Sequence, residues 1–169
     1  MRIKIFKYFN NVSRKKLLLE IKNDICHAYG REIAWYSNVD YINSVFHHKR
    51  QKMPRYISTI AREVEKACNL ENGFLDSVLI NIYHKETQTT EFHKDNSIIF
   101  HKEIIVNLSL FTDAILNIRD ENLNTISFNV KPNDIFILPG GSFQELFEHE
   151  VISQKNRVSL SFRNTNGGK

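Results

Sequence analysis

The sequence has few cysteines and no long apolar run, and each absence excludes a class of protein. Only two cysteines occur, Cys26 and Cys68, and they are not spaced as a zinc-binding pair. A disulfide framework and a structural zinc site are therefore not expected, and both thiols should be buried as small apolar groups. No apolar stretch approaches the roughly 18 residues that cross a membrane, so no membrane anchor is expected.

The beginning of the chain also lacks a targeting pattern. Residues 1–10 mix basic and apolar side chains, without the uninterrupted apolar core and the small-residue cleavage site of a secretory signal. The default expectation is therefore a cytoplasmic protein. At 169 residues, with neither repeats nor linkers, the chain suits one domain with one core.

Charge gives only a weak indication of the partner. The net charge is +4 and the pI is near 9.0, which favours an anionic partner such as nucleic acid. An excess this small is common in proteins that bind no nucleic acid, so charge alone does not decide the matter. The composition, 41% hydrophobic and 25% charged, is typical of a globular protein.

The first half of the chain has helical periodicity. One helix is predicted between a cap at Ser13 and a stop at Gly30. A second helix is predicted to begin near Pro54 and to end at Asn72 and Gly73. The apolar stripe of the first consists of Leu17, Leu18, Ile21, Ile25 and Ala28, and that of the second of Ile57, Ile60, Ala61, Val64 and Ala67.

The second half changes to a period of two, which is typical of strands. The predicted strands are Val78–Tyr83, Ile104–Leu110, Ala114–Arg119, Ile126–Val130, Asp134–Leu138 and Arg157–Phe162. Many short strands predict a sandwich or a jelly roll. The whole pattern predicts an α+β fold, with N-terminal helices flanking a β core.

His93 and Asp95 form a pattern that suits a metal site. Side chains two positions apart on a strand point to the same side, roughly 7 Å apart along the backbone, so these two can share one ion. Non-haem iron oxygenases bind iron with two imidazoles and one carboxylate, which requires a second histidine. His149 is our candidate, because a jelly roll can bring a distant strand back against the first. The His-x-Asp pattern alone is weak, since such short matches also occur at ordinary surface positions.

A second polar pattern lies in the closing strand, where polar and apolar residues alternate from Arg157 to Arg163. The simple interpretation is an edge strand with one solvated face. The functional alternative uses length: at about 3.3 Å per residue the two arginine Cα atoms lie roughly 20 Å apart, a span that two inward-reaching guanidinium groups and a five-carbon dicarboxylate can fill. Asn81 and Tyr83 share a face of another predicted strand and can hydrogen-bond the same acid.

Together these residues resemble the AlkB family of Fe(II)/2-oxoglutarate-dependent dioxygenases. The order Asn-x-Tyr, His-x-Asp, a distant histidine and Arg-x-Ser-x-x-x-Arg is similar to the family's order, and the resemblance runs from about Trp35 to Asn164. The chain is most similar to the AlkB domains of plant RNA virus replication proteins in Asp134-Ile-Phe-Ile-Leu-Pro, Phe143-Gln144, His149-Glu-Val151 and the closing strand.

The resemblance implies a double-stranded β-helix (jelly roll) core, with Fe(II) as the metal and 2-oxoglutarate and O2 as co-substrates. Its metal ligands would be His93, Asp95 and His149. The 2-oxoglutarate contacts would be Asn81, Tyr83, Arg157, Ser159 and Arg163, with Arg157 at the distal carboxylate and Arg163 near the metal-bound end. Ser159 replaces an asparagine of some relatives, and no side chain beyond the metal ligands is expected to be catalytic.

The resemblance also implies a substrate lid at residues 31–55, between a helical region at 1–30 and a jelly-roll core at 74–165. Three aromatic residues of this lid, Trp35, Tyr36 and Tyr41, can either stack on a displaced base or simply close the core. A basic cluster follows, made of Lys49, Arg50, Lys52 and Arg55. It can hold phosphates or be an ordinary solvated face.

Some residues depart from the family pattern or have no place in it. Asn96 and Ser97 stand where relatives often have acidic residues that help to read the base, which leaves the base open. Asn133-Asp134 replaces a Gly-Asp turn, and asparagine tolerates the left-handed conformation that such a turn needs. His101 is the one rival metal ligand. Surface or packing roles are expected for His27, His47, His48 and His84.

The activity that the resemblance implies is oxidative removal of N-methyl lesions, such as 1-methyladenine and 3-methylcytosine, from single-stranded nucleic acid. The products would be formaldehyde, succinate and CO2. RNA is favoured over DNA because of the likeness to viral replication proteins, and the host cytoplasm is the expected location if the chain is a domain of a viral polyprotein. A monomer without membrane contact is expected. Two alternatives stay open: a hydroxylase of a protein or small molecule, and a non-catalytic nucleic-acid-binding module.

Overall fold

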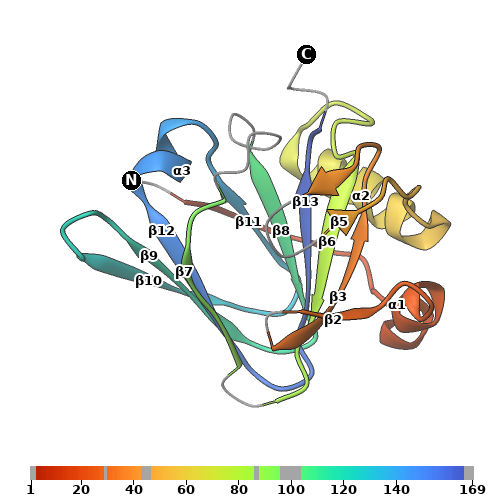
Figure 1. Cartoon of the computed structure of the whole chain (residues 1–169), viewed down its shortest axis with the longest axis horizontal. Helices are drawn as coiled ribbons and strands as arrows, with labels where there is room; N and C mark the ends of the chain where they lie inside the picture. Colours follow the sequence, from red (N-terminus) through yellow and green to blue (C-terminus); the bar gives the residue numbers. More distant parts are fainter. Residues whose placement is uncertain (1–2, 29, 43–46, 86–87, 96–103, 166–169) are drawn as a thin grey trace.

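The computed structural model describes residues 3–28, 30–42, 47–85, 88–95 and 104–165. Two β-sheets face each other, and two helices lie outside one of them (Figure 1). None of the described helices is long and apolar enough to cross a membrane.

The larger sheet has seven antiparallel strands in the order β1-β11-β8-β13-β6-β3-β2. Their bounds are Lys4–Lys7 for β1, Asp134–Leu138 for β11, Ile105–Leu110 for β8, Val158–Arg163 for β13, Ser77–Ile82 for β6, Arg31–Tyr36 for β3 and Cys26–Ala28 for β2. β13 lies in the middle of this sheet, paired with β6 on one side and β8 on the other. The alternation along β13 therefore does not mark an edge strand, and the simple interpretation of that pattern is wrong.

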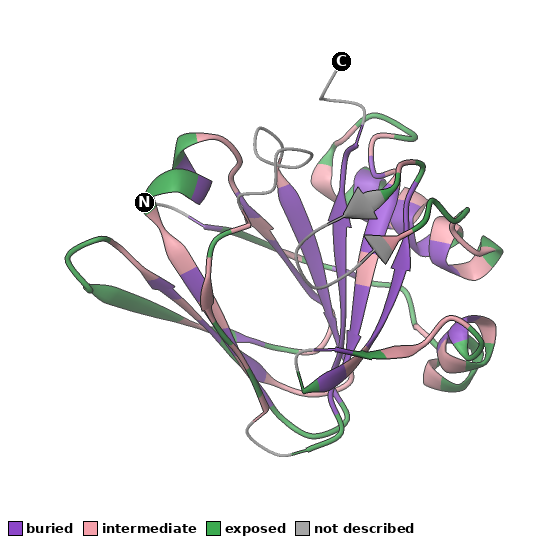
Figure 2. Cartoon of the chain, in the orientation of Figure 1, coloured by how far each residue is buried: buried purple, intermediate pink, exposed green. Residues whose placement is uncertain are grey.

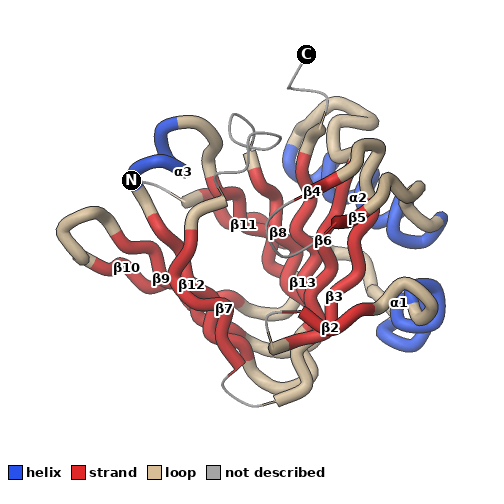
Figure 3. The backbone as a smooth tube through the Cα atoms, viewed as in Figure 1, coloured by secondary structure: helices blue, strands red, loops and turns tan. Residues whose placement is uncertain are grey.

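The smaller sheet has four strands in the order β10-β9-β12-β7. Their bounds are Thr125–Val130 for β10, Ala114–Arg119 for β9, Glu148–Ser153 for β12 and Gln88–His93 for β7. From β6 onward the chain passes back and forth between the two sheets, whose strands are all drawn in red in Figure 3. This winding is a jelly roll, so the predicted fold class is confirmed.

Helices α1 (Arg14–Ile21) and α2 (Arg55–Cys68) cover the outer face of the larger sheet. The core between them includes Leu17 and Ile21 of α1, Ile57, Ile60, Ala61 and Val64 of α2, and Val158, Leu160 and Phe162 of β13. Because side chains alternate along a strand, the remaining residues of β13 face the smaller sheet. Figure 2 shows that the strands in the middle of the larger sheet are buried along most of their length.

The inner face of the larger sheet, which faces the smaller sheet, is partly apolar and partly polar. A second core joins the two sheets through Ile105, Phe136 and Leu138 on one side and Ala114, Leu116, Ile118 and Val151 on the other. Elsewhere the inner face carries polar side chains that are also buried: Asn81, Asn107, Ser109, Ser159 and Ser161. Buried polar groups need hydrogen-bond partners or a polar ligand, so this part of the face is a natural place for a binding site.

The N-terminal region is less helical than predicted. Ser13 caps α1 as expected, accepting a hydrogen bond from the Lys16 amide, but the helix ends at Ile21. The following residues form β2, which pairs with β3, and β1 adds a strand at the other edge of the same sheet. Pairing at a sheet edge satisfies the backbone groups that a longer helix would otherwise satisfy.

The second helix begins as predicted and ends earlier. Asn69 adopts the left-handed conformation (φ 56°) and ends α2 before the predicted stop at Asn72 and Gly73. Ala67 is exposed, and Glu65 is buried instead because amides of the next loop donate hydrogen bonds to its carboxylate. The two cysteines are free. Both are half-buried, whereas the sequence predicts buried thiols.

Residues 31–55, the predicted lid, begin inside the larger sheet, and a lid role for the rest stays a prediction. Their first six residues form β3, which pairs with β6 inside the larger sheet. β3 is buried on both faces, which removes the simple alternation that marks a half-exposed strand. Of the later described part, β4 (Tyr41–Ile42) and β5 (His47–His48) pair as a separate two-stranded antiparallel sheet.

Candidate metal and co-substrate site

Two of the three predicted metal ligands lie on neighbouring strands of the smaller sheet. His93 is the last residue of β7, His149 lies in β12, and the register of the sheet pairs the two directly. Their ring centroids are 4.2 Å apart. The register shifts between His149 and Val151, so the regular pairing of the two strands is interrupted beside the histidines.

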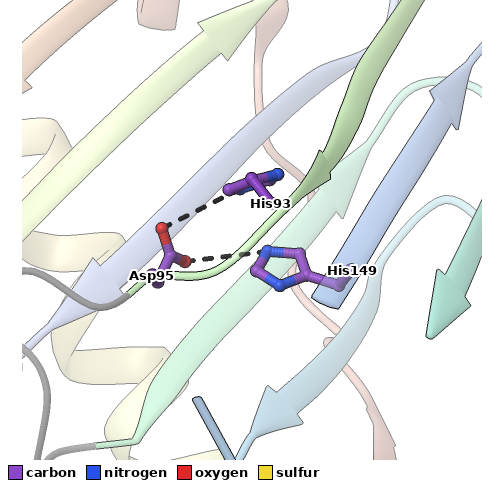
Figure 4. Close-up of side chains that lie close together, drawn as sticks. All are labelled: His93, Asp95 and His149. Atoms are coloured by element: carbon purple, nitrogen blue, oxygen red, sulfur yellow. Dashed lines mark ion pairs between the residues drawn. The ribbon is translucent and has the colours of Figure 1, made fainter. Parts of the chain in front are cut away.

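Asp95 lies two residues beyond the end of β7, and its carboxylate turns toward both histidines (Figure 4). Its Oδ1 is 3.9 Å from Nε2 of His93, and its Oδ2 is 3.7 Å from Nε2 of His149. One ligand atom of each residue lies within 4.8 Å of the others. Two imidazoles and one carboxylate are the donor set of non-haem iron oxygenases, so these residues fit Fe(II).

The protonation states of these residues also suit a cation. Nδ1 of His93 lies 2.7 Å from the carbonyl oxygen of Glu91, and a ring N–H donated there leaves the Nε2 lone pair facing Asp95. Burial raises the pKa of Asp95, but Arg163 and the two histidines outweigh it and lower that pKa to about 2. Burial lowers the pKa of His149 to about 4 although Asp95 opposes this shift. At neutral pH Asp95 is therefore ionised and His149 is neutral, as metal binding requires.

Arg157 is a cation buried on the inner face of the larger sheet. Its side chain is 1% exposed, its Nε donates to Ser109 Oγ, and its Nη1 donates to Ser153 Oγ, both at 3.0 Å. Within the described residues, no carboxylate pairs with Arg157, and burial lowers the pKa of its guanidinium. A buried cation without a counter-anion is costly, so its surroundings favour an acidic ligand.

Tyr83 lies beside this guanidinium, directly after β6. Its ring centre is 5.3 Å from Cζ of Arg157, and its hydroxyl is 3.1 Å from Thr90 Oγ1 in the opposite sheet. Burial raises the pKa of Tyr83, but Arg157 and Arg31 outweigh burial and lower it. A phenol in this field is a good hydrogen-bond donor to an acid bound at Arg157.

Asn81 and Ser159 are paired across β6 and β13, on the same inner face. The Oδ1 of Asn81 accepts a hydrogen bond from Arg31 Nε at 2.7 Å, and its Nδ2 donates to Ser159 Oγ at 3.4 Å. Because Arg31 occupies the amide oxygen, Asn81 presents its NH2 group to Ser159. A donor in this position suits a carboxylate ligand.

Arg163 lies at the metal end of the same strand. Its Nη2 is 3.2 Å from Oδ2 of Asp95, and its Nη1 donates to the Ser161 carbonyl oxygen at 3.2 Å. Arg157 and Arg163 thus stand at opposite ends of a polar strip that contains Ser159 and Ser161. This is the placement predicted for the two ends of a diacid, whereas the binding role of each residue stays a prediction.

Two of the predicted base-stacking residues, Trp35 and Tyr36, lie on opposite faces of the larger sheet. Tyr36 faces the outer core, is fully buried, and donates its hydroxyl to Asp24 Oδ2 at 2.7 Å, so it cannot stack on a base. Trp35, next to it on β3, faces the inner side and is also buried, at 6% exposed, with its ring centre 6.1 Å from that of His48. The side chain of Tyr41 lies outside the described part of the structure.

The basic cluster is at the surface. Lys49, Arg50, Lys52 and Arg55 are all exposed. The Arg50 amide donates to Asp40 Oδ1 at 2.7 Å, which fixes the backbone of this segment. The cluster is thus accessible to phosphates, and whether it binds them stays a prediction.

Among the described residues, no second group of metal-binding side chains accompanies His93, Asp95 and His149. His27 and His84 are exposed and lie 3.5 and 2.7 Å from the carboxylate of Glu32, which agrees with the predicted surface roles. His101, Asn96 and Ser97 lie outside the described residues, as does the side chain of His47.

Several residues of the site were not found from the sequence. Ser109, Ser153 and Arg31 hold Arg157 and Asn81, and Thr90 meets Tyr83. Gln144 contacts the backbone of Asp95. The one signal available was alternation, since Ser109 follows Asn107 and Ser153 follows His149 at even spacing on their strands.

Comparisons with known proteins agree with this site. A family model described as the 2OG-Fe(II) oxygenase superfamily matches residues 20–168. The RNA replication polyprotein of Citrus leaf blotch virus is 26% identical over 136 residues, which are 79% of this chain and 6% of the polyprotein. The chain thus spans about 6% of the length of the curated relative that it matches.

One solved structure shows the fold. The structure of OsALKBH1 superposes with a TM-score of 0.58 at 18% identity, covering 79% of this chain and 78% of that one. At this identity the likeness shows a shared AlkB-like fold and no more. Because the family model extends over most of the residues, we conclude that the chain belongs to the 2OG-Fe(II) oxygenase superfamily, which uses Fe(II), 2-oxoglutarate and O2.

Proposed function

We propose that this protein is an oxidative demethylase that removes N-methyl groups from bases of single-stranded nucleic acid, with RNA favoured over DNA. One observation carries the oxygenase part of the proposal: Arg157 is buried without a carboxylate partner in the described residues, on the strand whose other arginine contacts Asp95. This arrangement offers a place for a diacid next to a place for a metal.

In this proposal His93, Asp95 and His149 bind Fe(II), which their donor set suits. Arg157 and Tyr83 bind the distal carboxylate of 2-oxoglutarate, while Arg163 lies near its metal-bound end. Asn81 and Ser159 line the middle of the strip. Residues 74–165 then carry every proposed metal and co-substrate contact.

With metal and co-substrates bound, O2 would be divided between two products: one atom would enter the carboxylate of the succinate that forms as 2-oxoglutarate loses CO2, and the other would convert the N-methyl group to N-hydroxymethyl. The N-hydroxymethyl group would then leave as formaldehyde, with its hydroxyl proton returned to the base nitrogen. The protein's own part is to bind and orient. Two hydrogen bonds from Arg157 to serines fix its guanidinium before the acid arrives, which lowers the entropic cost of binding. Asp95 stays ionised and His149 neutral, so neither has to lose a proton at neutral pH. No side chain is needed as a general acid or base.

The nucleic-acid part of the proposal is supported by the exposed basic cluster and the viral relative. A base that is methylated on its Watson-Crick edge cannot pair, so it leaves a stack at low cost. Trp35 is 6% exposed, so its surroundings would have to open before stacking on its ring could stabilise the base by roughly 1–3 kcal/mol. Lys49, Arg50 and Arg55 would bind phosphates in a salt-dependent and sequence-independent way. RNA is favoured because the matched relative is an RNA replication polyprotein, which also suggests the host cytoplasm.

The test measures formaldehyde and succinate release from matched RNA and DNA oligomers that carry 1-methyladenine or 3-methylcytosine, single and double stranded, at fixed salt. We expect the highest release from single-stranded RNA, and none without Fe(II) or in Asp95→Ala. Turnover of 2-oxoglutarate without demethylation of either polymer would point to a protein or small-molecule hydroxylase. Oligomer binding without any turnover would point to a non-catalytic binding module.

A further inference from the structure

The three proposed metal ligands are held in different ways. His93 and His149 lie in strands whose backbones pair with each other, and this pairing fixes the positions of both side chains. Asp95 lies beyond the end of β7, and among the described residues no strand pairing holds its backbone. Side-chain contacts from other described parts of the chain reach it instead.

Gln144 supplies such a contact from the short helix α3 (Ser142–Leu146). Its side chain is fully buried, and its Oε1 accepts a hydrogen bond from the Asp95 backbone amide at 3.3 Å. Its Nε2 donates to the Pro139 carbonyl oxygen at 3.0 Å, which anchors the amide to the loop after β11. Both ends of the Gln144 amide are therefore used, and Asp95 is tied to the larger sheet.

A second contact joins the same two segments. Nζ of Lys94 donates to the Glu145 carbonyl oxygen at 2.5 Å, so neighbouring residues on each side are linked. Lys94 is exposed, which makes this bond weaker than the buried one. Arg163 holds the carboxylate of Asp95 instead, with its Nη2 at 3.2 Å from Oδ2.

We infer that Gln144 is a positioning residue for the metal site: it fixes the backbone of Asp95 so that the carboxylate meets the two histidines. The inference rests on the proposed function, because it takes Asp95 as a metal ligand. Partners that orient a ligand are worth roughly 10- to 100-fold in metal affinity. Loss of the Gln144 amide should therefore weaken metal binding by an amount in this range.

The test is a Co(II) titration of the metal-free full chain, followed by absorption spectroscopy, with thermal unfolding measured in parallel. Gln144→Met keeps the length of the side chain and removes both hydrogen bonds, and we expect its Co(II) dissociation constant to rise roughly 10- to 100-fold. Gln144→Asn, which is one methylene too short to span both partners, takes its place with the same expectation if the methionine variant does not fold.

Two further variants separate positioning from stability. Phe143→Leu loosens α3, where Phe143 is stacked on Phe147, without touching Asp95, and should lower the unfolding temperature while Co(II) affinity stays unchanged. Gln144→Glu keeps the oxygen that accepts from Asp95, so it should recover most of the affinity. If Gln144 only stabilised the fold, Gln144→Glu should bind Co(II) more weakly than Gln144→Met, because glutamate adds a buried charge.

The outcomes distinguish this inference from the proposed function. Wild-type affinity in Gln144→Met, an equal loss in Phe143→Leu, or a Gln144→Glu variant as weak as Gln144→Met would each overturn the positioning role. Asp95→Ala tests the metal site itself and should lose Co(II) binding whether or not Gln144 positions Asp95. If that variant binds Co(II) normally, the proposed metal site itself is wrong.

Discussion

Replacing Arg157 by methionine should change stability and co-substrate affinity in different ways. In the free protein this guanidinium is buried, and no carboxylate of the described residues compensates its charge. Replacing buried charges by apolar groups of similar size is often neutral or stabilising by about 1–4 kcal/mol. The loss of two hydrogen bonds to serines costs about 1 kcal/mol each. We therefore expect the free energy of unfolding of the metal-free variant to be close to that of the native protein or higher.

The affinity for 2-oxoglutarate should fall at the same time. A charge-assisted hydrogen bond to a carboxylate is worth about 1.5–3 kcal/mol, so the dissociation constant should rise roughly 10- to 150-fold. At a concentration 100 times its dissociation constant, 2-oxoglutarate stabilises the native protein by about 2.7 kcal/mol. After a 100-fold loss of affinity, the same concentration stabilises the variant by only about 0.4 kcal/mol.

The assay combines urea unfolding of the metal-free proteins with calorimetric titration of 2-oxoglutarate in the presence of Mn(II). Arg119→Met is the matched control, because it removes the same charge from a partly exposed ion pair with Glu148. It should leave the 2-oxoglutarate affinity unchanged. If Arg157→Met binds 2-oxoglutarate as well as Arg119→Met does, the acid is not bound at Arg157 and the reasoning fails.

Three further predictions concern other residues of the site. The folded pKa of His149, about 4, lies below its unfolded value of 6.5, so protonation favours the unfolded chain and the stability present above pH 6.5 is lost as the pH falls toward 4. The free energy of unfolding of the metal-free protein, measured with urea, should thus fall by about 2 kcal/mol between pH 7 and pH 5. In His149→Asn this fall should be absent. Arg31→Met should raise the KM for 2-oxoglutarate roughly 2- to 10-fold at unchanged kcat, because Asn81 loses the hydrogen bond that orients its amide. A KM equal to that of the native protein would contradict this. Trp35→Leu should weaken binding of methylated oligomers by roughly 1–3 kcal/mol in a fluorescence titration while 2-oxoglutarate turnover without substrate is retained, and a parallel loss of both would mark Trp35 as a packing residue.

The strands of the second half could be predicted because their side chains alternate. Ala114–Arg119 and Asp134–Leu138 have the predicted bounds, and the others differ by one residue at an end or at both. Asn133 has a φ of 65°, so it takes the left-handed turn conformation expected of it. In contrast, β7 and β12 have no clear apolar pattern, and only the metal motif suggested that strands lie there.

The placement of site residues could be predicted where they follow at even spacing along a strand and just past its end, as His93 and Asp95 or Asn81 and Tyr83 do. The partners Ser109, Ser153 and Gln144 could not, because their contacts depend on how separate strands and the loop before β12 come together in space. Tyr36 was placed wrongly for a related reason. In a strand buried on both faces, the sequence does not say which aromatic residue faces the helices and which faces the site.

The central position of β13 has a consequence for the order in which this protein can be completed. During synthesis from the N-terminus, β6 and β8 emerge long before β13, and until β13 inserts between them each has an unpaired edge. Arg157, Ser159 and Arg163 arrive with β13, at the same step. A chain that has not finished folding therefore exposes two unpaired strand edges, and, if the proposed site is right, it also lacks the residues that bind 2-oxoglutarate.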